Sequence, residues 1–90
     1  IIAVNSAIGP YAHIGAFAMV TSLVAILTGA KIGQAVFVGA CSCVTENVSV
    51  GNGCMIGVGT VVSRNLDKGV FFLGNPGRVL NKVELPIELQ

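Results

Sequence analysis

The chain of 90 residues has no tryptophan, only one tyrosine, and a charged fraction of just 10%. With so few charges a monomer would leave much apolar surface uncovered, so we expect other copies of the chain to bury part of it. The formal net charge is +1 and no basic run occurs, which argues against a nucleic-acid-binding protein. Ninety residues make at most one small domain, whose core is marginal in size.

The chain also lacks the residues of a disulfide scaffold or a zinc site. Its three cysteines, Cys41, Cys43 and Cys54, form no CxxC pair, and one histidine cannot complete a Cys/His set. An odd, low number of cysteines favours a reducing compartment, so we expect a cytoplasmic protein with no bound metal. A metal held by three copies of His13 would require the His13 column to face a threefold axis, which is the less favoured interpretation.

One uncharged stretch, residues 14–30, has to be weighed as a membrane span. Its seventeen residues include three Ser or Thr and two Gly, which places it at the low edge of the required length. No basic segment precedes it, as a secretory signal would require. The sequence starts without Met and directly on a repeat, so we expect it to be part of a longer chain.

A six-residue repeat runs without insertion from residue 2 to residue 62. Its first column contains only Ile and Val: Ile2, Ile8, Ile14, Val20, Ile26, Ile32, Val38, Val44, Val50, Ile56 and Val62. Four residues after each aliphatic comes a small or slender residue: Ser6, Ala12, Ala18, Val24, Ala30, Val36, Ser42, Val48, Cys54 and Thr60. A glycine often follows the aliphatic directly, and we expect these glycines to form tight corners.

The two columns predict an all-β prism. The small residue and the next aliphatic are two apart, so on an extended segment they point to the same side. A turn after each such pair, three times per coil, gives eighteen residues per coil and about 4.8 Å between coils. We therefore predict a parallel β-helix of three to four coils over residues 1–69, with a closing strand and tail over residues 70–90. The unbroken period argues against a membrane helix, but it does not fix the hand of the β-helix.

Residues eighteen apart share a face, so the outward side chains can be read as columns. One column is bulky and apolar (Met19, Phe37, Met55), one is polar (His13, Lys31, Ser49) and one is small (Ala7, Ala25, Cys43, Val61). A prism with one apolar face should self-associate, and its threefold outline favours a homotrimer. The alternative is that the apolar column packs under a terminal helix or loop.

The segment after Val62, "SRNLDKGVFFLGNPGRVL", together with the preceding "GVGTVV", closely resembles the last coil of hexapeptide-repeat acyltransferases. The resemblance covers about residues 2–80 and is nearest to the sialic acid O-acetyltransferase and nucleotide-amino-sugar N-acetyltransferase subgroup. Its most specific element is residues 74–78, "GNPGR". The resemblance implies a left-handed β-helix that transfers an acetyl group from acetyl-CoA to a sugar or amino-sugar, with the cofactor between subunits of a trimer. The cofactor-binding residues that it implies are Gly57, Val58, Gly59, Arg64, Gly74, Asn75, Pro76 and Arg78, with Lys68 and Lys82 as further cations near the phosphates.

Acyl transfer needs a base for the attacking hydroxyl or amine, and histidine is the usual provider. The family's histidine positions fall here on Pro10, followed by Tyr11, and on Met19, none of which is a base at neutral pH. His13 is therefore the candidate catalytic residue. Three possibilities remain open: His13 is a relocated base, an amine acceptor of low pKa needs no base, or the chain is a noncatalytic trimeric assembly module. Cys41 and Cys43 have no neighbouring base in the sequence, and Cys54 occupies an inward column.

Overall fold

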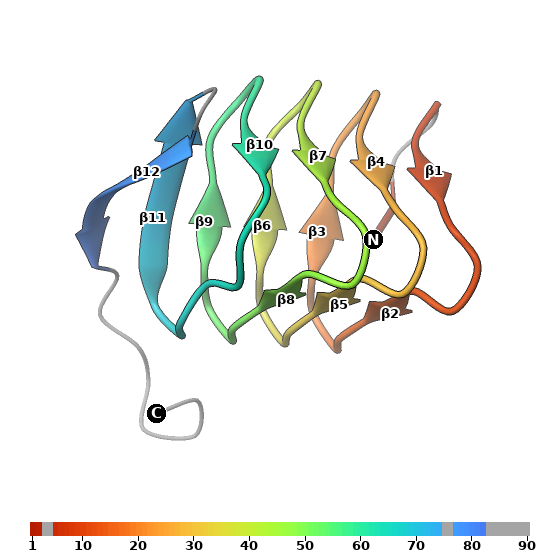
Figure 1. Cartoon of the computed structure of the whole chain (residues 1–90), viewed down its shortest axis with the longest axis horizontal. Helices are drawn as coiled ribbons and strands as arrows, with labels where there is room; N and C mark the ends of the chain where they lie inside the picture. The colour runs from red at the N-terminus through yellow and green to blue at the C-terminus, as the bar shows by residue number, and fades with distance from the viewer. Residues whose placement is uncertain (3–4, 75–76, 83–90) are drawn as a thin grey trace.

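The computed structural model describes residues 1–2, 5–74 and 77–82, which form a triangular prism of stacked coils (Figure 1). Ten two-residue strands build the coils, and two longer strands close one end. The strands are β1 (Ala7–Ile8), β2 (His13–Ile14), β3 (Met19–Val20), β4 (Ala25–Ile26), β5 (Lys31–Ile32), β6 (Phe37–Val38), β7 (Cys43–Val44), β8 (Ser49–Val50), β9 (Met55–Ile56), β10 (Val61–Val62), β11 (Val70–Gly74) and β12 (Gly77–Lys82).

Every third strand belongs to the same face of the prism. The β1 sheet has the order β1-β4-β7-β10, the β2 sheet the order β2-β5-β8, and the β3 sheet the order β3-β6-β9-β11-β12. Strands within the coils pair in parallel at a spacing of eighteen residues, as in Met19↔Phe37 and Phe37↔Met55. This register confirms the predicted parallel β-helix and its three outward columns.

No helix occurs in the described part of the chain. In those residues the structure therefore contains no helix that is both long and apolar enough to cross a membrane. Residues 14–30, which were weighed as a span, contribute the end of β2, all of β3 and β4, and the turns around them.

The core fills the inside of the prism with the two predicted inward columns. The buried Ile and Val residues are Val20, Ile26, Ile32, Val38, Val44, Val50, Ile56 and Val62, and the small column is buried beside them from Ala18 to Thr60. Ile2 and Ile8 remain exposed because the first coil has a neighbour on one side only. Buried hydroxyls are satisfied inside the stack, since the Ser42 hydroxyl donates to the Gly57 carbonyl over 2.8 Å.

The glycines after the aliphatic residues lie at the turns, but they are not the left-handed residues. The left-handed corners lie two residues further along, for example at Tyr11 (φ 63°), Phe17 (φ 61°) and Gly59 (φ 69°). A Cβ on Gly15 would lie 2.5 Å from the carbonyl carbon of Gly33 in the next coil. Real Cβ atoms do not come this close to backbone, so these glycines permit the coils to approach. They begin the turns, as the Gly9 carbonyl that accepts from the Ala12 N–H shows, but another residue takes the left-handed conformation.

The hexad phase ends after β10, and a hairpin then covers the end of the prism. Leu66 forms a bridge with Val50, and β11 stacks on β9 with Phe72 beside Ile56. The strand β12 returns antiparallel beside β11, with Leu73 opposite Arg78. Phe72 is 1% exposed and is among the largest fully buried side chains of the described residues, so β11 completes the core.

Candidate functional site

One corner of the prism brings together several of the predicted cofactor-binding residues. The turn Gly57–Gly59 follows β9, and its first N–H donates to the Phe72 carbonyl of β11 over 2.9 Å. The Gly74 N–H, at the end of β11, donates to the Thr60 hydroxyl over 3.2 Å. The structure therefore places the 57–59 turn and Gly74 side by side, where the closing hairpin meets the last coils.

Two of the three residues of this corner are glycines, so it carries few side-chain atoms. Val58 is 68% exposed, and a Cβ built on Gly59 would meet no atom within 4 Å. The Leu73 side chain lies against Gly57 on the other flank. A long, thin, amide-bearing arm such as pantetheine needs little side-chain bulk beside it, and this corner offers that.

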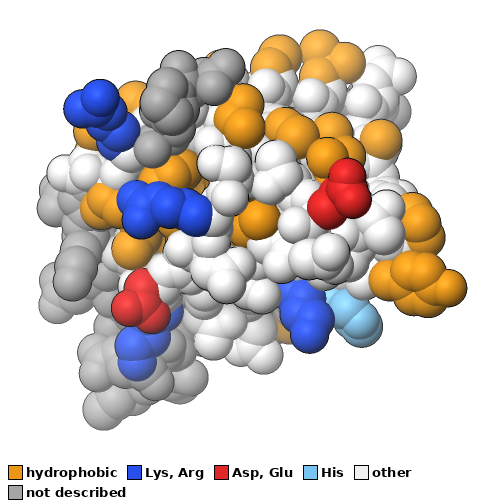
Figure 2. All heavy atoms as spheres, in the orientation of Figure 1, with side chains coloured by type: hydrophobic (Ala, Val, Ile, Leu, Met, Phe, Trp, Pro, Cys, Tyr) orange, Lys and Arg blue, Asp and Glu red, His pale blue; other side chains and the backbone are white. Residues whose placement is uncertain are grey.

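Arg78 supplies positive charge next to the corner. It lies opposite Leu73 in the β11–β12 pair, and its side chain is exposed. Figure 2 shows several Lys and Arg side chains gathered at this end of the molecule. Asn75 and Pro76 lie outside the described residues, as does the side chain of Lys82, so those predictions stay predictions. Lys68 is exposed in the segment between β10 and β11.

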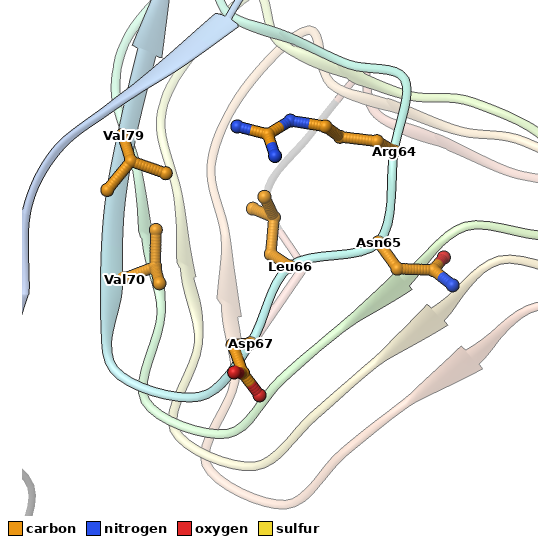
Figure 3. Close-up of a pocket in the computed structure, with 6 residues that line it drawn as sticks. All are labelled: Arg64, Asn65, Leu66, Asp67, Val70 and Val79. Atoms are coloured by element: carbon orange, nitrogen blue, oxygen red, sulfur yellow. The ribbon is translucent and has the colours of Figure 1, made fainter.

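Arg64 lies at a different corner from Gly57–Gly59. It follows β10, and its guanidinium lies over the Phe72 ring, 5.3 Å from the ring centroid. The side chain borders a hollow of about 380 Å³ at the end of the prism (Figure 3). The residues that line this hollow are Arg64, Asn65, Leu66, Asp67, Val70 and Val79. The structure thus divides the predicted cofactor residues into a corner group and an end hollow.

His13 lies far along the fold from both groups. It is exposed on β2, in the first coil and on the β2 sheet, with Lys31 beside it in register. The corner 57–59 instead joins the β3 sheet to the β1 sheet, near the opposite end of the stack. Within one chain, the described residues do not bring His13 to the corner, and its catalytic role stays a prediction.

The cysteines divide as expected into two outward thiols and one core residue. Cys54 is fully buried, and its thiol donates to the Asp67 carbonyl over 2.9 Å. Burial is the main cause that raises the pKa of the Cys54 thiol above its ordinary value. A neutral, buried thiol is a poor nucleophile, which confirms Cys54 as a core filler. Cys41 is exposed and Cys43 is half-buried.

The predicted apolar column is present on the β3 sheet and is longer than the sequence suggested. Met19, Phe37 and Met55 are 41%, 38% and 40% exposed. Phe71 of β11 continues the column, because it pairs with Met55. The hexad count missed Phe71, since the phase breaks before it. We call Met19, Phe37, Met55 and Phe71 the apolar stripe.

Potential metal ligands do not gather in the described residues. Within residues 1–2, 5–74 and 77–82, no group of three or more His, Cys, Asp or Glu side chains is arranged to hold a metal ion.

The fold of this prism is similar to that of several solved acyltransferases. A mutant of AntD, an N-acyltransferase from Bacillus cereus solved with dTDP-4-amino-4,6-dideoxyglucose and coenzyme A, matches 89% of this chain at a TM-score of 0.73 and 20% identity. PerB from Caulobacter crescentus, solved with CoA and GDP-perosamine, matches 90% at 0.63 and 18% identity. A maltose O-acetyltransferase from Clostridium difficile matches 93% of this chain and 70% of its own, at a TM-score of 0.62 and 18% identity.

The matches differ in how much of each neighbour they cover. The chain spans 64% of the AntD chain and 58% of the PerB chain. No family model matches the sequence, and no curated protein matches it. The similarity is therefore one of fold: the chain has the left-handed parallel β-helix of the hexapeptide-repeat acyltransferases.

Proposed function

We propose that this protein transfers an acetyl group from acetyl-CoA to a sugar or amino-sugar. The observation that carries the proposal is the bare corner of Gly57, Val58 and Gly59 beside Gly74, on a fold whose solved neighbours contain CoA. In the reaction, the acceptor oxygen or nitrogen forms a bond to the acetyl carbonyl carbon as the carbon–sulfur bond breaks. The acceptor proton passes to a base, and the thiolate of CoA leaves and takes up a proton.

The residues at the corner fit the acetyl donor in two ways. The two glycines of the corner and the open space at Gly59 leave room for the pantetheine arm and its amides. The exposed Arg78 on the adjoining hairpin provides a cation for a phosphate group. Arg64 is the weaker candidate for this role, because its guanidinium lies over Phe72 at another corner.

We also propose that the working unit is a homotrimer. The apolar stripe is about 40% exposed at its first three residues, and burying it against a second copy would remove a continuous apolar surface from water. His13 stays the candidate base of this unit, on the β2 sheet and not on the sheet that carries the apolar stripe. Sedimentation of the full chain tests the assembly, and a stable monomer at low micromolar concentration contradicts it. The three thiols, which form no disulfide, favour a cytoplasmic location.

The second candidate function is a noncatalytic trimeric assembly module. The position of His13 favours it, because one chain does not bring this residue to the corner. The two functions require the same fold and differ in whether the protein acetylates an acceptor.

Acetyl transfer to a panel of sugars and amino-sugars separates the two, with release of the CoA thiol as the readout. We expect turnover with at least one acceptor, and a His13→Ala variant that binds CoA as the wild type does but loses about 10²-fold or more of the rate. Ser49→Ala is the matched control, because Ser49 lies in the same outward column as His13, two coils further along the chain. Unchanged activity in His13→Ala removes the histidine from the mechanism, and no turnover with any acceptor favours the assembly module.

A further inference from the structure

The hollow at the closed end of the prism has an interior that differs from its rim. Figure 3 shows the side chains of Arg64, Leu66, Val70 and Val79 pointing toward one another, while those of Asn65 and Asp67 point away. The Asn65 amide oxygen accepts a hydrogen bond from the Ser49 N–H over 2.9 Å. The space of about 380 Å³ is thus bordered inside by one guanidinium and aliphatic groups.

Among the residues that the structure describes, the guanidinium contacts an aromatic ring and forms no ion pair with a carboxylate. Its contact with the buried Phe72, 5.3 Å to the centroid, is a cation–π interaction that fixes the group without using its N–H donors. An arginine side chain has five such donors in a planar fork that matches a carboxylate. This contact places the fork at the edge of the hollow.

The walls of the hollow suit a short hydrocarbon chain. Leu66 and Val70 are 6% and 5% exposed and form the floor, and Val79 of β12 is 44% exposed and forms one side. The volume falls within the range of small-molecule sites. Phosphate alone would leave this apolar surface unused.

The charge balance favours a ligand with a single negative charge. Among the described lining residues, Arg64 is the charged side chain that points into the hollow, while Asp67 points away from it, so one carboxylate would balance the charge inside. We propose that the end hollow binds a short aliphatic carboxylate, with the carboxylate on Arg64 and the chain against Leu66, Val70 and Val79. This site is separate from the corner proposed for acetyl-CoA.

Titration of the full chain with hexanoate, followed by NMR of the backbone amides, tests the proposal. We expect saturable shifts at Leu66, Val70 and Val79, and at least fivefold weaker binding of hexanol and hexylamine. Arg64→Gln should weaken hexanoate at least fivefold, whereas Lys68→Gln, which removes an exposed cation from the same segment, should leave it unchanged. Equal binding of hexanol, an equal loss in both variants, or no binding of hexanoate overturns the proposal.

Two further measurements keep the test decisive. Val79→Asp places a hydrated negative charge in the hollow where the hydrocarbon chain of the ligand would lie and should abolish binding, which provides a second variant if Arg64→Gln does not fold. Competition with CoA separates this site from the proposed function. Displacement of hexanoate by CoA would make the hollow part of the acetyl-CoA site and overturn the proposal. Hexanoate binding that persists when CoA is bound, or when CoA fails to bind, supports the proposal.

Discussion

The stacked coils of this protein follow a regular sequence repeat, whereas the closing hairpin does not. The coils repeat one pattern every six residues, and residues 1–30 carry no Asp, Glu, Lys or Arg. The segment from Arg64 to Arg78 breaks the pattern and contains Arg64, Asp67, Lys68 and Arg78. The difference shows that the repeat supplies a rigid scaffold and one apolar stripe, while the corner, the hollow and most of the charge are found where the repeat ends.

The largest expected effect comes from breaking the junction between the two regions. Phe72→Ala removes a ring that is 1% exposed and supports the Arg64 guanidinium, and we expect a loss of about 3–5 kcal/mol in the free energy of unfolding. Phe17→Ala, at a coil corner where the ring is 92% exposed, is the control and should change stability by about 0.5 kcal/mol or less. Urea unfolding measures both variants. Equal losses would mean that the hairpin does not complete the core.

A smaller effect distinguishes glycines that face the backbone of the next coil from glycines in a left-handed conformation. A Cβ on Gly39 would lie 2.7 Å from the Val58 backbone nitrogen in the next coil, so Gly39→Ala should cost about 1–3 kcal/mol. Gly59 has open space but a φ of 69°, so Gly59→Ala should cost about 1 kcal/mol through its left-handed backbone alone. Gly59→Asn should recover most of that loss, because asparagine tolerates this conformation. A Gly39→Ala variant as stable as the wild type would refute the close-approach explanation.

The smallest effect concerns the Cys54 thiol, which donates a hydrogen bond to the Asp67 carbonyl in the segment after β10. Burial raises the pKa of Cys54 above the ordinary value of 9.0, so the unfolded chain loses this proton more readily than the folded one. The contribution to stability is therefore complete below about pH 9 and is lost as the pH rises above it. Thermal unfolding between pH 7 and 10.5 measures it. Cys54→Val, which places in this column the residue found at Val36 and Val48, should lose that part of the pH dependence.

The sequence was sufficient for the fold of the coils because their register is a fixed count of eighteen residues. The same count fails at the hairpin, where Phe71 pairs with Met55 sixteen residues earlier. Because of this shorter spacing, the count of eighteen did not predict that Phe71 belongs to the apolar stripe. The count also could not predict the contact between Arg64 and Phe72, because that contact depends on where β11 lies. The resemblance to the acyltransferases named Gly57, Gly59 and Gly74 as one cofactor-binding set, and the hydrogen bonds of Gly57 to Phe72 and of Gly74 to Thr60 show that they lie side by side.

The corner glycines show a second limit of sequence reasoning. A glycine column indicates that side chains are excluded, but not whether a turn or a neighbouring backbone excludes them. Tyr11 and Phe17 take the left-handed conformation at their corners, while Gly15 and Gly39 face the next coil. Only the stacking of coils decides between the two causes.

Titration of the full chain with CoA, followed by NMR of the backbone amides, tests the central claim most directly. The proposal predicts saturable binding below millimolar concentration, with the largest shifts at Gly57, Gly59 and Gly74. An Arg78→Glu variant should bind about tenfold more weakly, and Lys31→Glu, on the β2 sheet, should bind as the wild type does. Absence of binding at millimolar CoA, or shifts confined to the β2 sheet, would contradict an acetyl-CoA site at this corner.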